Sequence, residues 1–295
     1  MKVRSAVLAV LLALSLALPA AAQQLTSDWT VGKLIEAVRA KGPIREGGRR
    51  VQPNIVAVDW ADYAFIIPAA GNVQGSGGTH FRSDVTLINY SDTPQRITVA
   101  WMPAGQNNCA AAVQSLTIGP GWRFYSDFVG QQLGRTGLGT LLFVAANDSG
   151  TLIDEDGEID GFSRIWTNQP NATGTVSQPF GSYSTDDLFS TLQAYIIGLR
   201  HDSGFRTNVG IVNLDSVEHT WDLEIHGAVT AGPGRFTMTV PGCALAQGGV
   251  PSGNWGPALV ALKARSPGPQ YWSAYASSTD NTTGDGWIVH ANHGL

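Results

Sequence analysis

The chain has 295 residues, of which only 14% are charged, and its 23 acidic and 18 basic side chains give a formal net charge of −5. A negative balance argues against a nucleic-acid partner and against a polybasic membrane-binding patch. Low charge combined with 35 glycines and 15 prolines is typical of a turn-rich extracellular β-protein rather than a cytosolic enzyme.

The first 22 residues have the features of a secretory signal peptide. Two basic residues begin the segment, Ala6 to Leu18 is an apolar run, and small residues precede a cut that we place between Ala22 and Gln23. The run is short for a membrane span, and no other segment reaches the roughly 20 apolar residues that a span needs. Without this segment 16 basic and 23 acidic side chains remain. We expect a secreted, periplasmic or cell-surface protein without a transmembrane segment.

Residues 23–52 are expected to form a short helix followed by a connector. Apolar residues recur with helical spacing over 31–40, and Asp28 or Thr30 could cap the first turn. A charged, glycine-containing stretch follows the helix. The helix is expected to cover the first folded unit, and docking of a partner on it is the alternative.

One ten-residue segment occurs twice in the chain. HFRSDVTLIN at 80–89 is followed, 124 positions later, by GFRTNVGIVN at 204–213. Further blocks match in the same order: Phe65–Pro68 with Tyr195–Gly198, Thr140–Val144 with Ala258–Leu262, and Phe162–Trp166 with Trp272–Ala276. Ordered self-similarity of this kind indicates two copies of one folding unit.

Nearly every matched block alternates apolar and polar residues as a half-buried β-strand does. Turn residues separate the blocks, and no helical pattern lies between them, which favours antiparallel sandwiches. We therefore predict an all-β protein with two tandem antiparallel β-sandwich domains of immunoglobulin-like type and a short N-terminal helix. The first domain is expected at 53–187 and the second at 188–295.

The repeated Phe-Arg-(Ser/Thr)-(Asp/Asn) pattern, followed by apolar residues and Asn, resembles a repeat module of secreted bacterial proteins. These proteins are described only as uncharacterised immunoglobulin-like β-sandwich repeats. The resemblance extends from Phe65 to the C-terminus in two copies and implies an envelope or extracellular role, often as an accessory or binding module. The residues that carry it, all expected to be structural, are Phe81, Arg82, Asn89, Phe205, Arg206 and Asn213. The alternative for the arginines is recognition of a carboxylate or sulfate on a ligand.

An acidic segment lies between two expected strands and has no acidic counterpart in the second repeat. Asp154, Asp156, Glu158 and Asp160 alternate with other residues, and glycines beside them permit sharp turns. Carboxylate oxygens arranged in this way can converge on a hard cation such as calcium. The spacing departs from that of an EF-hand loop, so a solvated hairpin tip is the alternative. No other cofactor is expected.

Three tryptophans lie beside glycine or proline in expected loops: Trp122, Trp255 and Trp287. Exposed aromatic rings on a rigid β-scaffold can stack on sugar rings or anchor a protein partner. They are therefore candidates for ligand binding, and the alternative is that they fill the ends of the sandwiches.

Two cysteines, Cys109 and Cys243, lie at non-equivalent places in the two repeats. An oxidising compartment permits a disulfide between them, which would join the two domains. Because their positions in the repeat differ, we expect two separate thiols more than a bridge.

No motif of a known hydrolase or phosphate-binding loop stands out. We expect a non-enzymatic protein for adhesion, scaffolding or binding of a glycan or protein. One alternative is a subunit of a surface filament or layer that self-associates by strand pairing. The other is an extracellular hydrolase with an unrecognised site.

Overall fold

The computed structural model describes residues 29–41, 62–75, 78–169, 173–184, 188, 192–228, 232–265, 268–269 and 271–292. The expected signal peptide and most of the expected connector lie outside these residues. Within them the chain is mainly β-strand, arranged in antiparallel sheets, with one short α-helix. None of the described helices has the length and apolar character needed to cross a bilayer.

The first nine strands form one sheet, which we call the N-terminal half. Their bounds are β1 (Ala64–Gln74), β2 (His80–Asn89), β3 (Gln95–Pro103), β4 (Gln114–Ile118), β5 (Gly121–Tyr125), β6 (Gly137–Ala146), β7 (Ile159–Asn168), β8 (Thr175–Gly181) and β9 (Tyr183–Ser184). The order is β4-β3-β6-β1-β2-β7-β8, with β5 also paired to β2 and β9 to β1. A five-residue π-helix, η2 (Phe128–Gln132), lies between β5 and β6.

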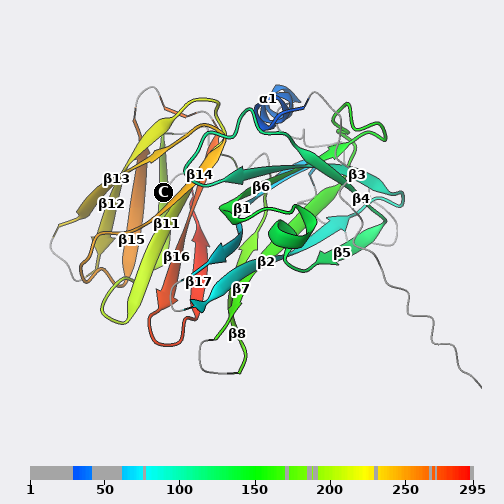
Figure 1. Ribbon diagram of the computed structural model, residues 1–295. Coiled ribbons are helices and arrows are strands. Elements are labelled where there is room, and N and C mark those ends of the chain that lie inside the picture. Colours follow the sequence, from blue (N-terminus) through cyan, green and yellow to red (C-terminus); the bar gives the residue numbers. More distant parts are fainter. Residues whose placement is uncertain are drawn as a thin grey trace, which may run out of the picture.

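The last eight strands form two sheets of four strands, which together we call the C-terminal half. Their bounds are β10 (Gln193–Leu199), β11 (Phe205–Asn213), β12 (His219–Gly227), β13 (Gly234–Val240), β14 (Ala244–Gly249), β15 (Ala258–Ala264), β16 (Trp272–Asp280) and β17 (Gly286–His290). One sheet has the order β10-β15-β12-β13 and the other β14-β11-β16-β17. Figure 1 shows the two halves side by side, the C-terminal half in yellow to red.

The strands of both halves pair in the same order. The series β4-β3-β6-β1 corresponds to β13-β12-β15-β10, and β5-β2-β7-β8 corresponds to β14-β11-β16-β17. In the N-terminal half β1 also pairs with β2, which joins the two series into one sheet. This common order lets ladder partners identify equivalent positions, independently of sequence similarity.

The ladder partners correct one of the sequence matches. Thr86 lies opposite Phe162 across β2 and β7, and Gly210 lies opposite Tyr275 across β11 and β16. Since Thr86 and Gly210 occupy the same place in the repeated segment, Phe162 corresponds to Tyr275. The expected match of Phe162 to Trp272 is therefore wrong by three residues.

Two buried clusters hold the fold together, and one of them extends across both halves. In the C-terminal half the apolar side chains of its two sheets meet around Trp221 and Trp272, which are fully buried. The cluster of the N-terminal half contains Phe65 and Phe143, but Leu245 and Tyr275 of the C-terminal half belong to it as well. The two halves therefore share a core at their junction.

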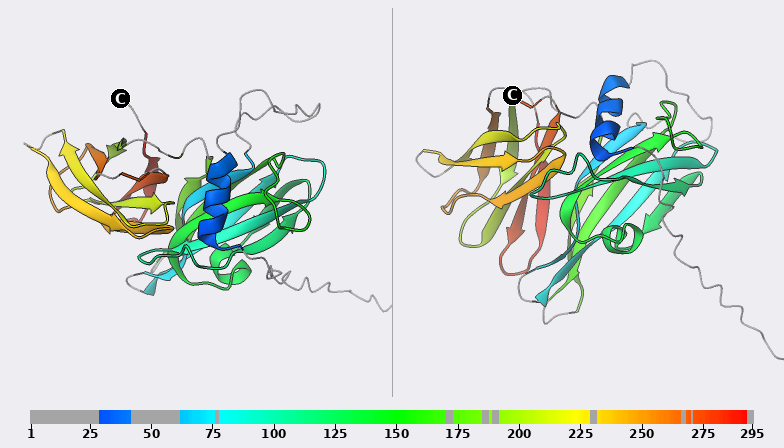
Figure 2. Two further views of the ribbon diagram at one scale, coloured as in Figure 1. Left: turned by 90° about the horizontal axis from the view of Figure 1, so that it is seen from above. Right: turned by 45° about the horizontal axis from the view of Figure 1, so that its top comes forward.

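The helix α1 (Val31–Lys41) begins and packs as the sequence predicts. Its apolar side chains at 31, 34, 35 and 38 are buried. The hydroxyl oxygen of Thr30 accepts a hydrogen bond from the amide of Lys33 at 3.4 Å, as an N-cap does. Seen from above in Figure 2, α1 lies across the N-terminal half on the side near the C-terminal half. Its position makes it part of the junction.

Candidate binding surface

Asn89 and Asn213 close equivalent turns in the two halves. The Asn89 side-chain amide donates to the carbonyl oxygens of Thr93 (2.7 Å) and Ile118 (3.4 Å). The Asn213 amide donates to the equivalent carbonyl oxygens, those of Val217 (2.8 Å) and Val240 (3.1 Å). Each Asn carbonyl oxygen accepts the backbone amide two residues later. These are the bonds of a turn-capping asparagine, the structural role expected for both residues.

The two Phe-Arg pairs lie near the sheet surface rather than in the cores. Phe81 and Phe205 are half-buried and belong to neither buried cluster. The Arg82 guanidinium lies over the ring of Trp166, 5.6 Å from its centroid. Arg206 is exposed and donates to a side chain in the turn after β16. Stacking and local hydrogen bonding account for both arginines without a ligand.

The acidic segment does not gather its carboxylates. Asp154 accepts the backbone amide of Asp156 at 3.3 Å, and Asp160 accepts the hydroxyl of Ser182 at 2.5 Å. Asp160 already belongs to β7, whereas the other three precede that strand. In the part of the chain that the structure describes, no three His, Cys, Asp or Glu side chains lie close enough to hold a metal ion. Asp154, Asp156, Glu158 and Asp160 therefore do not converge as a calcium site requires.

The three candidate tryptophans have different environments. Trp255 is only 8% exposed, and its indole donates to the carbonyl oxygen of Pro251 at 2.9 Å, which favours the alternative of a packing role. Trp287 is 37% exposed and donates to the carbonyl oxygen of Gly198 at 2.9 Å. Trp122 is 74% exposed, and it lies in strand β5 rather than in a loop.

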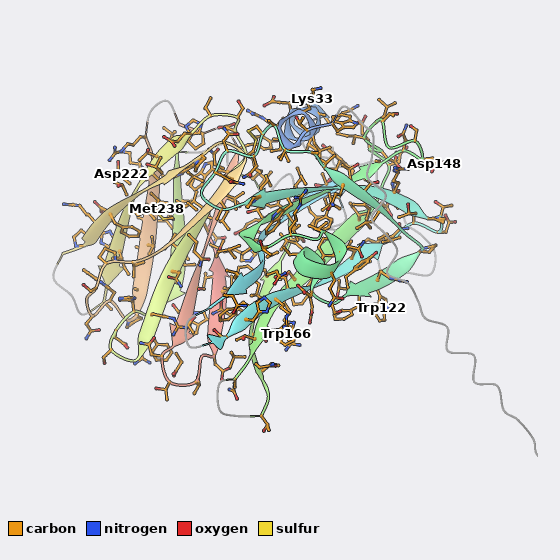
Figure 3. All side chains as sticks on the ribbon, in the orientation of Figure 1. Lys33, Trp122, Asp148, Trp166, Asp222 and Met238 are labelled. Carbon is orange, nitrogen blue, oxygen red and sulfur yellow. A yellow bond between two sulfur atoms is a disulfide. The ribbon has the colours of Figure 1, made fainter. Side chains whose placement is uncertain are left out.

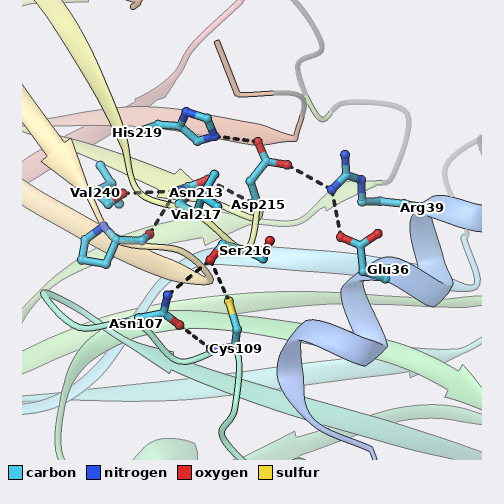
Figure 4. A network of polar contacts seen from close by, with 11 residues as sticks. Glu36, Arg39, Asn107, Cys109, Asn213, Asp215, Ser216, Val217, His219 and Val240 are labelled. Atoms are coloured by element: carbon cyan, nitrogen blue, oxygen red, sulfur yellow. Dashed lines mark hydrogen bonds and ion pairs between the residues drawn. The ribbon is translucent and has the colours of Figure 1, made fainter. Parts of the chain in front are cut away.

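Cys109 and Cys243 form a disulfide, where the sequence favoured two separate thiols. The loop after β3 brings Cys109 onto the turn between β13 and β14, so positions that are not equivalent in the repeats meet at the junction. Nearby, the Asn108 side chain donates to the carbonyl oxygen of Cys243 at 2.9 Å. Asn107 donates to the carbonyl oxygen of Ser216 at 3.3 Å, as Figure 4 shows. The bridge thus joins the N-terminal half to the C-terminal half.

An ion-pair network anchors α1 to the C-terminal half. Arg39 of α1 lies 3.0 Å from Oδ1 of Asp215 and 3.1 Å from Glu36, and His219 lies 3.1 Å from Oδ2 of Asp215 (Figure 4). The Arg39 guanidinium also covers the ring of Tyr271, 5.0 Å from its centroid. Asp215 therefore contacts two nitrogen-bearing side chains from different elements, which suits an anchor for α1 better than a catalytic dyad.

An exposed apolar surface lies on the outer side of β5, β2 and β7. Trp122 and Phe124 of β5 project from it, beside Ile88 of β2 and Phe162 of β7. Phe124 is 52% exposed and Phe162 is 42% exposed. We call this surface, with Trp166 at its far end, the aromatic face. Figure 3 shows Trp122 and Trp166 on the side of the N-terminal half away from α1.

Of the residues in the aromatic face, only Trp122 was a binding candidate from the sequence. Phe124 follows Trp122 by two residues, which is the spacing of one face of a strand. Assigning β5 as a strand would have placed both rings on the same side. Phe162 was matched to Trp272, which is buried, so its exposure was not expected.

Three polar side chains around the aromatic face form hydrogen bonds within the protein. Asp84 accepts the backbone amide of Asp127 at 3.2 Å, and Arg164 donates to Thr175 at 2.8 Å. Asp160 accepts both a hydroxyl and a backbone amide. The surface is therefore apolar rings on a rigid sheet, bordered by polar groups that already have protein partners.

Burial raises the pKa of Asp160 above its usual range, although hydrogen bonds from Ser182 and Gly161 act in the opposite direction. Burial, followed by the Asp160 charge, likewise raises the pKa of Tyr90. The folded state therefore holds the Asp160 proton more tightly than the unfolded chain does. Above the folded pKa the ionised, partly buried carboxylate lowers stability, and this cost disappears as the pH falls through that pKa.

Asp160→Asn is expected to raise the melting temperature at pH 7, because an amide oxygen keeps the two acceptor contacts without a buried charge. The gain should shrink as the pH falls and vanish below the unfolded-state pKa of about 3.9, where wild type is also neutral. Thermal unfolding followed by circular dichroism at several pH values measures it. A variant less stable than wild type at neutral pH, or a difference independent of pH, would contradict this account.

No protein-family model matches this chain, and no curated protein or solved structure matches it either.

Proposed function

We propose that this chain is a secreted, non-enzymatic binding protein of the cell envelope or extracellular space, built from two copies of an immunoglobulin-like β-sandwich unit. The first 22 residues, in which an apolar run follows two basic residues, support secretion. The common pairing order and the equivalent bonds of Asn89 and Asn213 support the duplication. The aromatic face supports the binding role.

The observation that carries the proposal is the exposure of Trp122, Phe124 and Phe162 together on one sheet. Contiguous exposed apolar surface is uncommon on monomeric soluble proteins and marks interaction sites. Tryptophan in particular is enriched at the centres of protein interfaces. Strands hold these rings in place, so binding would not require them to become ordered first.

No observation favours the hydrolase alternative to a comparable degree. His219 meets a buried carboxylate, but that carboxylate also binds Arg39 of α1. His201 accepts the backbone amide of Thr207 at 3.0 Å, and its burial lowers its pKa. Both histidines thus have structural partners.

The test is cosedimentation of the labelled exported protein with the envelope fraction of the producing cells. We expect wild type to sediment with that fraction and the W122S/F162S variant to lose at least about 90% of the bound signal, equivalent to a loss of about 1.4 kcal/mol or more. The matched control is Ile197→Ser, which removes a 49% exposed strand residue from another sheet. Wild type that remains in the supernatant, or a W122S/F162S variant that binds as wild type does, refutes the proposal.

A further inference from the structure

Three positions equivalent to members of the aromatic face are buried in the C-terminal half, whereas Gln247, which corresponds to Phe124, is exposed. Ladder partners give the correspondence at three apolar positions: Trp122 with Leu245, Ile88 with Val212, and Phe162 with Tyr275. The three residues of the C-terminal half are all 0% exposed. We call them the junction face.

The N-terminal half is what covers the junction face. The ring of Phe180 packs edge-on against Tyr275, with centroids 5.2 Å apart. The amide of Gly105 donates to the carbonyl oxygen of Leu245 at 3.0 Å. Tyr183 donates its hydroxyl to the carbonyl oxygen of Ala274 on the same sheet, at 2.7 Å. This side of the β14-β11-β16-β17 sheet is therefore a contact surface between two β-units of one chain.

The residue opposite the central aromatic ring is Gly210 in the C-terminal half and Thr86 in the N-terminal half, and this difference fits the contact of Tyr275 with Phe180. A Cβ atom on Gly210 would overlap the ring of Tyr275, which Phe180 presses onto the sheet. The equivalent residue in the N-terminal half is Thr86, whose partner Phe162 is 42% exposed. The covered ring, Tyr275, lies over Gly210, whereas the exposed ring, Phe162, has the side chain of Thr86 as its neighbour.

We propose that the aromatic face is also a contact surface between β-units, and that its occupant is a second copy of this chain. The proposal rests on the binding function proposed above and names the partner. Within the chain, this side of the sheet is buried against another unit of the same kind, and the exposed copy carries larger side chains at two of the three apolar positions, Trp122 against Leu245 and Ile88 against Val212. One unit covering another, with different surfaces in contact, is a heterologous arrangement that can extend between molecules.

The polar border of the aromatic face favours a protein over a sugar as occupant. A sugar site needs donors and acceptors aimed at hydroxyl groups beside the stacking ring. Here Asp84, Asp160 and Arg164 all bond to the protein itself. The remaining surface around Trp122 and Phe162 offers apolar area, which a second apolar protein surface complements.

The size of the aromatic face sets the expected strength of association. Three strands and four rows of outward side chains cover an area of about 400 Å². Stable dimers bury about 800 Å² on each partner, so this contact should be reversible, with dissociation in the micromolar range.

The experiment is analytical ultracentrifugation of the exported form alone, from low micromolar to several hundred micromolar. We expect reversible self-association of wild type and of Ile197→Ser, and at least tenfold weaker association of W122S/F162S with an unchanged far-ultraviolet spectrum. A closed dimer and an open series of oligomers both support the proposal, since both place a second copy on the face.

A wild-type protein that stays monomeric over this range overturns the proposal, as does self-association that W122S/F162S leaves unchanged. Titration of the same samples with chitohexaose and cellohexaose provides the second arm. The protein could instead be monomeric and bind one of the oligosaccharides saturably. If W122S/F162S then loses that binding, the second-copy proposal is overturned and the binding function stands. If the protein is monomeric and the substitutions change neither oligosaccharide binding nor envelope cosedimentation, the binding function and the second-copy proposal are both refuted.

Discussion

Replacing both cysteines, as C109S/C243S, is expected to lower the free energy of unfolding by about 3 to 5 kcal/mol. The bridge joins residues 134 positions apart and so restricts a large part of the unfolded chain. It also fixes the loop after β3 against the turn before β14, where Asn108 bonds to the carbonyl oxygen of Cys243. For a chain of this length the change corresponds to a fall of about 10 °C in melting temperature.

Calorimetry of wild type and C109S/C243S, each with and without a reductant, measures this effect. Reduced wild type should melt near the temperature of the variant, and the reductant should not shift the variant. Limited proteolysis should cut the variant first in the loop Ala104–Val113, because that segment loses its covalent attachment. Equal melting temperatures for oxidised wild type and the variant would contradict the stabilising role of the bridge.

The class of fold and the local turn chemistry could be predicted from the sequence because both depend on short-range patterns. Alternation along strands and helical spacing at 31–40 are local, and both were correct. Asn89 and Asn213 were also assigned correctly, since an Asx turn depends on residues two to four positions away.

The exposure of the aromatic rings could not be predicted, because it depends on which sheet face another part of the chain covers. Phe162 and Tyr275 stand in equivalent strands with the same alternation, yet Tyr275 is covered by Phe180 and Phe162 is not. Trp122 and Trp255 both lie near glycines in the sequence. Trp255 folds over Gly234 and is buried, whereas Trp122 projects from β5.

The disulfide escaped prediction for the same reason. The two cysteines are not equivalent in the repeat alignment, which favoured two separate thiols over a bridge. The contact arises where the N-terminal half packs against the C-terminal half, and that arrangement depends on the placement of all the strands. Long-range packing of the two halves thus sets the junction.

Asn213→Ala is expected to lower the free energy of unfolding by about 3 kcal/mol, because it leaves several buried backbone groups without partners. The Asn213 amide donates to the carbonyl oxygens of Val217, Val240 and Pro241, and its carbonyl oxygen holds the backbone amide of Asp215. The residue is completely buried, so water cannot replace these bonds.

A double-mutant cycle separates this loss from a general weakening of the fold. Asn213 positions Asp215, and Asp215 holds Arg39 of α1 at 3.0 Å. The cost of Arg39→Ala measured by urea unfolding should therefore be smaller in the Asn213→Ala background than in wild type, with a coupling of about 1 kcal/mol. Asn89→Ala is the matched control, since Asn89 makes equivalent bonds in the other half but does not position Asp215. The effect of Asn89→Ala should simply add to that of Arg39→Ala. Equal coupling energies in the Asn213 and Asn89 cycles would show that Asn213 does not act through the α1 anchor.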